Sequence, residues 1–264
     1  MIPKRIFFYW HDVKLPDCLD RFVRTWKNHN PNFEFVTLNQ DNLNDYISSY
    51  PENFKKLQIQ HQSDYIRLKV LYEYGGVYAD ISTICLKSLE QYIDFKLDRL
   101  NGRKYLFSQG VIENFFLASN KHNPELKIWL EELMYAINIG FASYKKIFRR
   151  QYPLVLFNLP YMTPYACFYR KLRHHPKVNF LFHEYNFKYL FDYYVNKLFK
   201  NEINLSKIQF IKLFGSSRSY FLENIEMHRE SNSEIFNYYS IEGYKYDLIH
   251  HEKYEDERRK LLFS

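Results

Sequence analysis

The first 85 residues alternate between short apolar runs and stretches of helical periodicity, and this alternation limits the possible folds most. Residues 5–10 (RIFFYW) form a continuous apolar run, which is typical of a strand buried on both faces. From Asp17 to His29 apolar residues recur every three or four positions, which predicts an amphipathic helix. Residues 33–38 predict a second strand, and residues 39–50 predict a polar helix. The alternation predicts an α/β domain with a largely parallel sheet.

The clearest predicted helix runs from Gln60 to Tyr74. Ser63 is its expected N-cap, and Gly75 stands where a C-terminal cap with positive φ belongs. A short strand over residues 77–79 follows and ends at Asp80. Ligands of open α/β sheets bind at the carboxyl ends of strands, so we expect Asp80 at a ligand-binding edge. A simple turn or capping role for Asp80 remains the alternative.

Beyond residue 100 the pattern weakens. It predicts strands at 104–107 and 111–118, a helix at 125–139, and a late strand at 208–214. Residues 141–200 are rich in Tyr, Phe and Lys, with helical stretches interrupted by prolines. The sequence has no internal repeat and no convincing linker, so we expect a single domain.

Composition and charge exclude several classes of protein. Hydrophobic residues make up 46% of the 264, which excludes disorder for most of the chain, and no run of about 18 apolar residues predicts a membrane-spanning helix. Three widely spaced cysteines predict reduced thiols. The apolar stretch over residues 6–10 is too short for the core of a signal peptide. For both reasons we expect a cytoplasmic protein. The net charge of +7 favours anionic partners, namely nucleic acid, phosphorylated substrates or an acidic membrane surface.

The segment from Gln62 to Ser82 carries the residues best suited to chemistry. Asp64 and Arg67 are three positions apart and share one helix face, although an ordinary ion pair would explain that spacing. Asp80 and the hydroxyl of Ser82 offer oxygen ligands to a hard divalent cation, which would neutralise a diphosphate.

Together these residues resemble the glycosyltransferases that carry a DXD motif within the block SDxxRxxxLxxxGGxYxD. That group includes family 32, the capsular polysaccharide synthesis proteins and the catalytic domain of the large clostridial glucosylating toxins. The matching segments, which cover roughly the first half of the chain, are Ile2–Ile6 leading into Trp10, Trp26-Lys27 with Asn30-Pro31, Ser63-Asp64 with Arg67, Gly75–Asp80 and, more weakly, Asn114–Pro124.

The resemblance implies a GT-A type nucleotide-sugar-binding fold, with a mostly parallel central sheet flanked by helices and a helix-rich C-terminal part. Residues 1–120 would form the nucleotide-sugar-binding half of the domain, and residues 121–264 the acceptor-side half. The donor would be a nucleoside diphosphate sugar, and UDP is favoured over GDP as its nucleotide. The acceptor would be a glycan or lipid-linked glycan, with no nucleic-acid partner. The positive charge of the chain, independently of the resemblance, would suit peripheral contact with the anionic inner membrane surface.

The resemblance also implies roles for individual residues. Trp10 would stack on the base, although a core aromatic is the equal alternative. Asp64 and Arg67 would hydrogen-bond hydroxyls of the donor sugar, and Asp80 would contact the ribose and the metal; these three are the expected catalytic residues. The full set expected against the donor is Tyr9, Trp10, Ser63, Asp64, Arg67, Tyr78, Ala79 and Asp80.

One position departs from the family motif. Ser82 stands where a second Asp would ligate the metal, so the expected Mn²⁺ or Mg²⁺ would be held by Asp80 and a weaker hydroxyl ligand. The basic stretch from Lys212 to Arg218 could reach the diphosphate, or form a plain surface loop.

The implied function is a retaining transfer of a hexose or N-acetylhexosamine to a glycan hydroxyl in bacterial surface polysaccharide synthesis, of capsule or lipopolysaccharide. Three alternatives stay open: a basic, aromatic nucleic-acid-binding protein, a degenerate transferase that binds nucleotide sugars without turnover, and a glycoside hydrolase with two carboxylates.

Overall fold

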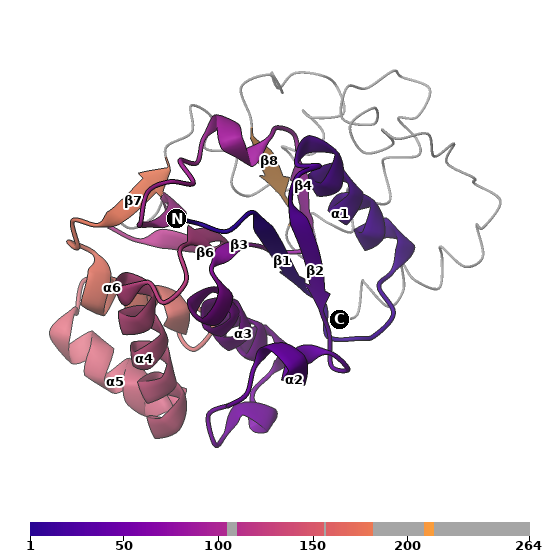
Figure 1. The fold of residues 1–264 in the computed structure, drawn as a ribbon. Coiled ribbons are helices and arrows are strands. Elements are labelled where there is room, and N and C mark those ends of the chain that lie inside the picture. Colours follow the sequence, from indigo (N-terminus) through magenta and orange to yellow (C-terminus); the bar gives the residue numbers. More distant parts are fainter. Residues whose placement is uncertain (105–109, 156, 182–208, 214–264) are drawn as a thin grey trace, which may run out of the picture. The chain divides into compact units, whose positions relative to one another are not determined.

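A computed structural model describes residues 1–104, 110–155, 157–181 and 209–213 (Figure 1). The chain divides into two compact units, and each is described by itself. Unit 1 comprises Met1–Val13, Asn32–Asp80 and Tyr92–Phe182, and unit 2 comprises Lys14–Pro31, Ile81–Gln91 and His183–Ser264.

Unit 1 is built on a six-stranded sheet with the strand order β2-β1-β3-β6-β5-β7. β1 pairs in parallel with β2 and β3, and β5 pairs in parallel with β7, whereas β6 runs antiparallel to both of its neighbours. The sheet is therefore mixed but mainly parallel, as expected. Its strands are β1 (Arg5–Tyr9), β2 (Glu34–Leu38), β3 (Gly76–Ala79), β5 (Leu100–Lys104), β6 (Ile112–Ser119) and β7 (Val178–Leu181).

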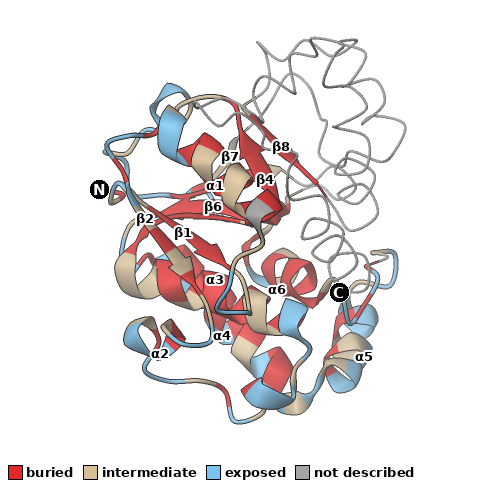
Figure 2. Cartoon of the chain, turned by 90° about the vertical axis from the view of Figure 1, so that its right-hand side faces the viewer, coloured by how far each residue is buried: buried red, intermediate tan, exposed pale blue. Residues whose placement is uncertain are grey.

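Helix α3 (Ile59–Tyr74) packs against β1, β3 and β6, and α4 (Pro124–Ile139) packs against α3 and α6 (Thr163–Leu172) (Figure 1). Figure 2 shows buried residues along β1 and on the inner faces of α3 and α4. The core of unit 1 therefore lies between the sheet and these helices. The remaining helices of this unit are α2 (Leu43–Tyr46), α5 (Phe141–Gln151) and a 3₁₀ helix at Phe54–Lys56.

Two glycines join α3 to β3. Gly75 has φ +66° and Gly76 has φ +105°, conformations that L-residues with side chains rarely adopt. A Cβ atom on Gly76 would lie 2.6 Å from the carbonyl oxygen of Arg5. The pair therefore lets β3 start directly after α3 and run close beside β1, which places Asp80 one residue beyond the end of β3.

Unit 2, in its described part, contains α1 (Asp17–His29), a 3₁₀ helix at Leu89–Gln91, and the antiparallel strands β4 (Thr83–Cys85) and β8 (Phe210–Lys212). The indole N–H of Trp26 on α1 donates to the carbonyl oxygen of Thr83 at 2.7 Å. The backbone N–H of Cys85 donates to the Thr25 hydroxyl at 2.9 Å. These bonds fix α1 on β4. All three cysteines are buried, and none forms a disulfide.

The structure confirms the predicted helices at 17–29, 60–74 and 125–139, within a residue of their bounds. Two local predictions are wrong. The helix predicted over 39–50 is found only as the short α2. The side-chain oxygens of Asn39 and Asn42 accept hydrogen bonds from backbone N–H groups of this segment, which favours a turn over a longer helix. Ser63 is not an N-cap, because α3 begins after the extended residue Gln58 and Ser63 lies in its second turn.

The strand predicted at 104–107 is found earlier, as β5, and residues 105–109 lie outside the described part. The late strand is confirmed as the shorter β8. In the described residues, no helix is both long and apolar enough to span a membrane. The division of the chain at residue 120 stays a prediction.

Candidate functional site

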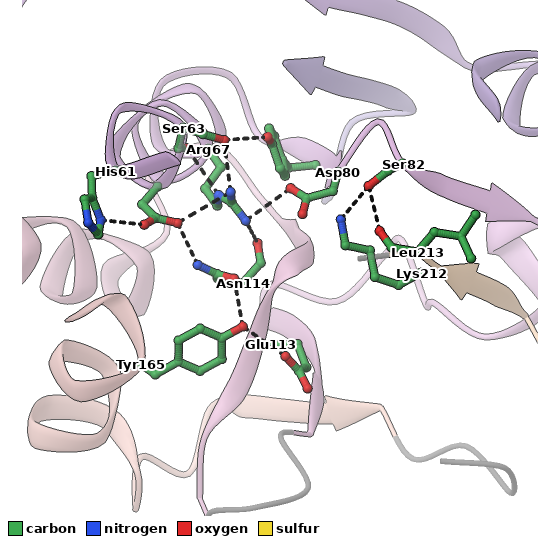
Figure 3. A network of polar contacts seen from close by, with 12 residues as sticks. His61, Ser63, Arg67, Asp80, Ser82, Glu113, Asn114, Tyr165, Lys212 and Leu213 are labelled. Carbon is green, nitrogen blue, oxygen red and sulfur yellow. Dashed lines mark hydrogen bonds and ion pairs between the residues drawn. The ribbon is translucent and has the colours of Figure 1, made fainter. Parts of the chain in front are cut away.

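Asp80 lies at the carboxyl edge of β3, as expected. Its backbone N–H donates to the carbonyl oxygen of Phe115 at 2.8 Å, which anchors it to β6. Its side chain is 22% exposed, and one carboxylate oxygen lies 3.3 Å from Nη1 of Arg67 (Figure 3). The carboxylate is therefore partly open to solvent but oriented by a buried positive charge.

Arg67 is the centre of a buried polar network on α3. Nη1 donates to the backbone oxygen of Asn114 at 2.7 Å, and Nη2 donates to the Ser63 hydroxyl at 3.0 Å. Nε donates to the Ser63 carbonyl oxygen at 3.2 Å, and the guanidinium lies 5.0 Å from the centroid of the Tyr78 ring. Since these contacts use every nitrogen of the guanidinium, Arg67 is suited to hold the carboxylates of this site in place.

The charge of Arg67 is secured by its neighbours. Burial would lower the pKa of Arg67, but the carboxylates of Asp80 and Asp64, together with the phenol of Tyr78, outweigh burial and raise it. The guanidinium therefore stays charged beside the two carboxylates.

Asp64 is buried, with 7% of its surface exposed. One of its oxygens accepts a hydrogen bond from the side-chain amide of Asn114 at 2.8 Å and lies 3.5 Å from Nη2 of Arg67. Its other oxygen lies 3.5 Å from Nδ1 of His61, whose ring packs edge-on against Phe141. Asp64 thus belongs to the same network as Asp80 through Arg67.

A second layer of polar side chains supports Asn114 (Figure 3). The Tyr165 hydroxyl lies 3.0 Å from an oxygen of the fully buried Glu113 and 3.0 Å from the side-chain oxygen of Asn114. Tyr161, on the loop before α6, is half-exposed; partial burial of its phenol and the nearby Asp64 and Asp80 raise its pKa. This loop therefore brings a phenol into the electrostatic field of the carboxylates.

Sequence reasoning did not assign site roles to His61, Glu113, Asn114, Tyr161 or Tyr165. The adjacent Glu113 and Asn114 were a usable signal, because two polar residues inside the buried strand β6 need partners. His61 and the two tyrosines gave no comparable signal, since their partners are remote in the sequence.

Three further residues expected to contact the donor, Tyr9, Tyr78 and Ala79, are buried. Tyr78 is 1% exposed, its hydroxyl lies 3.3 Å from that of Ser63, and Ala79 is fully buried. Tyr9 is also buried, with its hydroxyl 3.1 Å from Nδ1 of His11, and burial raises its pKa to about 12. The structure therefore brings Ser63, Tyr78 and Ala79 into the core around Arg67.

Trp10 follows β1 at the same edge of the sheet as Asp80, because β1 and β3 are parallel neighbours. Its residue is half-buried, and its backbone N–H donates to the carbonyl oxygen of Leu38 at 3.0 Å. Its indole N–H is buried and has no hydrogen-bond partner among the described residues. A buried donor without a partner destabilises the folded protein by about 1–3 kcal/mol, and a hydrogen bond to a ligand oxygen or a water molecule would remove this cost.

Ser82 lies in unit 2, directly before β4, and its hydroxyl is fully engaged there. It accepts a hydrogen bond from the ammonium of Lys212 at 2.8 Å and donates to the carbonyl oxygen of Leu213 at 3.1 Å (Figure 3). Lys212 is 5% exposed and Ser82 is 4% exposed. The remainder of the predicted basic stretch, residues 214–218, lies outside the described residues.

This arrangement does not fit a metal ligand at Ser82. A Mg²⁺ ion would need the hydroxyl oxygen at about 2.1 Å, while the Lys212 ammonium already lies 2.8 Å from that oxygen. Two unit charges about 4 Å apart repel by about 4 kcal/mol at an effective dielectric constant of about 20, and a divalent ion doubles this. Nor do the described residues contain a cluster of three or more His, Cys, Asp or Glu that could hold a metal. Mn²⁺ or Mg²⁺ at Asp80 stays a prediction.

Residues 16–99 match the family model of a glycosyltransferase sugar-binding region containing a DXD motif, which confirms the resemblance. The chain is 26% identical over 153 residues to the O-glycosyltransferase braB of Annulohypoxylon truncatum, covering 48% of this chain and 36% of that protein. It is 24% identical over 169 residues to inositol phosphoceramide mannosyltransferase 1 of Schizosaccharomyces pombe, covering 59% and 50%. The chain thus spans half or less of the length of these relatives.

Among solved structures, the chain is similar to the glycosyltransferase GlyE of Streptococcus pneumoniae TIGR4. The TM-score is 0.51 with 13% sequence identity, covering 99% of this chain and 64% of that one. A likeness at this level concerns the fold alone. It confirms the expected fold class, α/β with a mainly parallel central sheet, which the chain shares with that glycosyltransferase.

Proposed function

We propose that this chain, which carries the DXD-type glycosyltransferase sugar-binding region over residues 16–99, is a glycosyltransferase. It transfers a hexose or N-acetylhexosamine from a nucleoside diphosphate sugar to a hydroxyl group of a glycan. The observation that carries the proposal is the partly exposed Asp80 carboxylate at the edge of β3, held 3.3 Å from the buried Arg67 guanidinium. That edge is where open α/β sheets bind their ligands.

The proposed donor contacts come from Asp80 and Trp10. Asp80 is held beside the Arg67 guanidinium and accepts hydrogen bonds from donor hydroxyls. Trp10 stacks on the base and offers its unsatisfied indole N–H. Asp64 and Asn114 are bonded to each other, and Asp64 lies beside the Arg67 guanidinium that contacts Asp80. They therefore influence the choice of sugar indirectly, by fixing the position of Arg67.

In the proposed reaction the bond between the anomeric carbon and the diphosphate oxygen breaks. A bond from the anomeric carbon to the acceptor oxygen forms on the same face, so the configuration is retained. The acceptor hydroxyl proton passes to the departing diphosphate, and the pair of electrons of the broken bond stays on that oxygen. The protein contributes orientation and a fixed electrostatic environment to this step.

The names of the relatives support the acceptor class, since one is an O-glycosyltransferase and another a mannosyltransferase of inositol phosphoceramide. A glycan or a sugar-bearing lipid is accordingly the proposed acceptor. Exposed basic residues on α5, among them Arg149 and Arg150, support peripheral contact with an anionic membrane surface. A role in bacterial surface polysaccharide synthesis stays a prediction.

The test is release of nucleoside diphosphate from a panel of UDP- and GDP-linked hexoses and N-acetylhexosamines, with and without glycan acceptors. We expect turnover with at least one donor, and a loss of at least about a hundredfold in Asp80→Asn, by analogy with removal of one preorganised polar group from an active site. Asp41→Asn, at an exposed carboxylate, is the matched control and should keep wild-type turnover. Wild-type turnover in Asp80→Asn, with the fold intact, would contradict the assignment.

A further inference from the structure

Tyr161 stands on a short turn whose backbone is held on both sides of it. The hydroxyl of Thr163, which is fully buried, donates to the carbonyl oxygen of Pro160 at 2.6 Å. The backbone N–H of Met162 donates to the carbonyl oxygen of Asn158 at 2.8 Å. Tyr161 itself is half-exposed. An exposed tyrosine on a fixed backbone offers a large contact area and loses little conformational entropy when a ligand binds.

This turn leads into α6, which is bonded to the polar network around Arg67. Four residues after Tyr161, the hydroxyl of Tyr165 lies 3.0 Å from the side-chain oxygen of Asn114 on β6 (Figure 3). The side-chain amide of Asn114 in turn donates to Asp64 at 2.8 Å. All of these residues belong to unit 1, as does Asp80.

The charges of this network act on the Tyr161 phenol. Partial burial and the carboxylates of Asp64 and Asp80 raise the pKa of Tyr161, while the Arg67 guanidinium opposes this change. The phenol therefore keeps its proton at neutral pH and can donate a hydrogen bond. Of the carboxylates that act on it, those of Asp64 and Glu113 are buried and that of Asp80 is partly exposed. A ligand in this part of unit 1 can therefore meet both the Asp80 carboxylate and the Tyr161 ring.

We propose that Tyr161 binds the sugar ring of the acceptor and thereby selects it, a specificity role that rests on the proposed function. A pyranose ring has hydroxyl groups at its rim and apolar C–H groups on its faces. A carboxylate suits the hydroxyl groups, and the ring of a tyrosine suits the C–H groups. In the proposed reaction the donor lies at Asp80, so the acceptor hydroxyl must come close to that carboxylate. Tyr161 also lies within residues 121–264, the half in which the resemblance predicts the acceptor side.

Steady-state kinetics distinguish an acceptor contact from a donor contact. Tyr161→Ala should raise the KM for the acceptor at least about tenfold, because truncating an aromatic contact residue removes most of its binding energy. Hydrolysis of the donor without acceptor should stay within about twofold of the wild type, since that reaction does not use the acceptor. Tyr161→Phe keeps the ring, so its KM for the acceptor should stay within about threefold. Tyr135→Ala, at a similarly exposed tyrosine on α4, is the matched control and should keep wild-type kinetics.

Two kinetic outcomes would overturn the proposal. One is an unchanged KM for the acceptor in Tyr161→Ala. The other is an equal loss of donor hydrolysis and of transfer, which would make Tyr161 a donor contact. Because Tyr161 is half-exposed, its replacement should leave the melting curve unchanged, and melting curves of each variant verify this.

Failure of the proposed function is recognised separately. If no nucleotide sugar is turned over, the proposed function is refuted, and binding of methyl α-mannopyranoside is measured by saturation-transfer NMR. Binding that is lost in Tyr161→Ala and kept in Tyr161→Phe would still support a sugar site at Tyr161. Absence of binding to the unchanged protein, or binding that Tyr161→Ala leaves unaffected, would refute the sugar site as well.

Discussion

At the scale of single residues, Arg67 determines the geometry of the site. Its guanidinium contacts Asp80, Asp64 and the backbone of Asn114, which come from three different elements. Sequence spacing alone favoured a simple ion pair with Asp64. The structure shows that this contact, at 3.5 Å, is longer than those to Asp80 and Asn114. Arg67 is therefore a positioning residue for both carboxylates.

Replacing Arg67 should strongly destabilise unit 1. Arg67→Ala leaves two carboxylates without their buried counter-charge, and breaking a buried pair in this way costs about 3–5 kcal/mol. Arg67→Lys keeps the charge but loses the forked hydrogen bonds, so we expect a smaller loss of about 1–3 kcal/mol. Urea unfolding followed by circular dichroism measures both.

The matched control is Arg24→Lys, because Arg24 pairs with Asp20 on a surface where both side chains are over a third exposed. A surface pair of this kind contributes about 0–1 kcal/mol, so the control should unfold like the wild type. If Arg67→Lys were as stable as Arg24→Lys, Arg67 would not organise the site.

At the scale of elements, the glycine pair between α3 and β3 controls where Asp80 stands. Gly76→Ala adds a Cβ atom 2.6 Å from the Arg5 carbonyl oxygen and imposes a positive φ on a residue with a side chain. The backbone strain alone costs about 1–2 kcal/mol, and relief of the clash must move β3 away from β1. We expect a loss of more than about 2 kcal/mol in urea unfolding.

Gly140→Ala separates strain from clash. Gly140 also has a positive φ of 81°, but a Cβ atom there would meet no atom within 4 Å. The free energy of unfolding of Gly140→Ala should therefore fall only by the cost of the backbone strain, about 1–2 kcal/mol. Equal losses at the two glycines would show that the contact with β1 does not matter.

Most elements of the first 80 residues were predictable, because β1, α1, β2, α3 and β3 each have a local apolar pattern. The polar segment over 39–50 has no such pattern, and its helix was predicted too long. The site was only partly predictable. Asp64, Arg67 and Asp80 share one sequence block, but Asn114 and Tyr165 join them from 50 and 101 residues beyond Asp64. The bond between Ser82 and Lys212 spans 130 residues. Contacts at such separations depend on strand order and register, which no local pattern encodes.

The packing of β4 in unit 2 predicts a dependence of stability on alkaline pH. Burial raises the pKa of the Cys85 thiol from its ordinary 9 to about 12. Between pH 9 and 12 the folded protein keeps a proton that the unfolded chain releases, so the free energy of unfolding falls as pH rises through this range and is unaffected by Cys85 below it. The slope from one such group reaches about 1.4 kcal/mol per pH unit.

Cys85→Ala and Cys85→Ser both remove this titration and should flatten the slope between pH 9 and 10 by the same amount, whatever their absolute stabilities. Urea unfolding at several pH values measures the slope. Burial raises the pKa values of the Tyr9 and Tyr65 phenols to about 12. Above pH 10 the free energy of unfolding therefore continues to fall with pH even in the Cys85 variants. An unchanged slope in both variants would show that the Cys85 thiol does not titrate in this range.

At the scale of the whole molecule, a net charge of +7 over 264 residues favours association with anionic surfaces. In the described residues of unit 1, basic side chains gather on α5, where Lys146, Arg149 and Arg150 are exposed, and Leu154 just beyond it is 93% exposed. An apolar side chain beside a basic helix face suits a membrane surface better than a dissolved anion. This placement is the basis of the proposed membrane contact.

Vesicle sedimentation tests that contact. We expect the chain to bind vesicles that contain phosphatidylglycerol and not pure phosphatidylcholine, and to dissociate as salt rises from about 0.1 M to about 1 M, which shortens the screening length from about 10 Å to about 3 Å. Replacing Arg149 and Arg150 by Gln should weaken binding by about 2 kcal/mol, or about 30-fold. Lys55→Gln with Lys56→Gln removes the same charge from another exposed site and is the control. Because the overall charge changes equally in both pairs, equal weakening would mean that net charge, and not α5, drives the association.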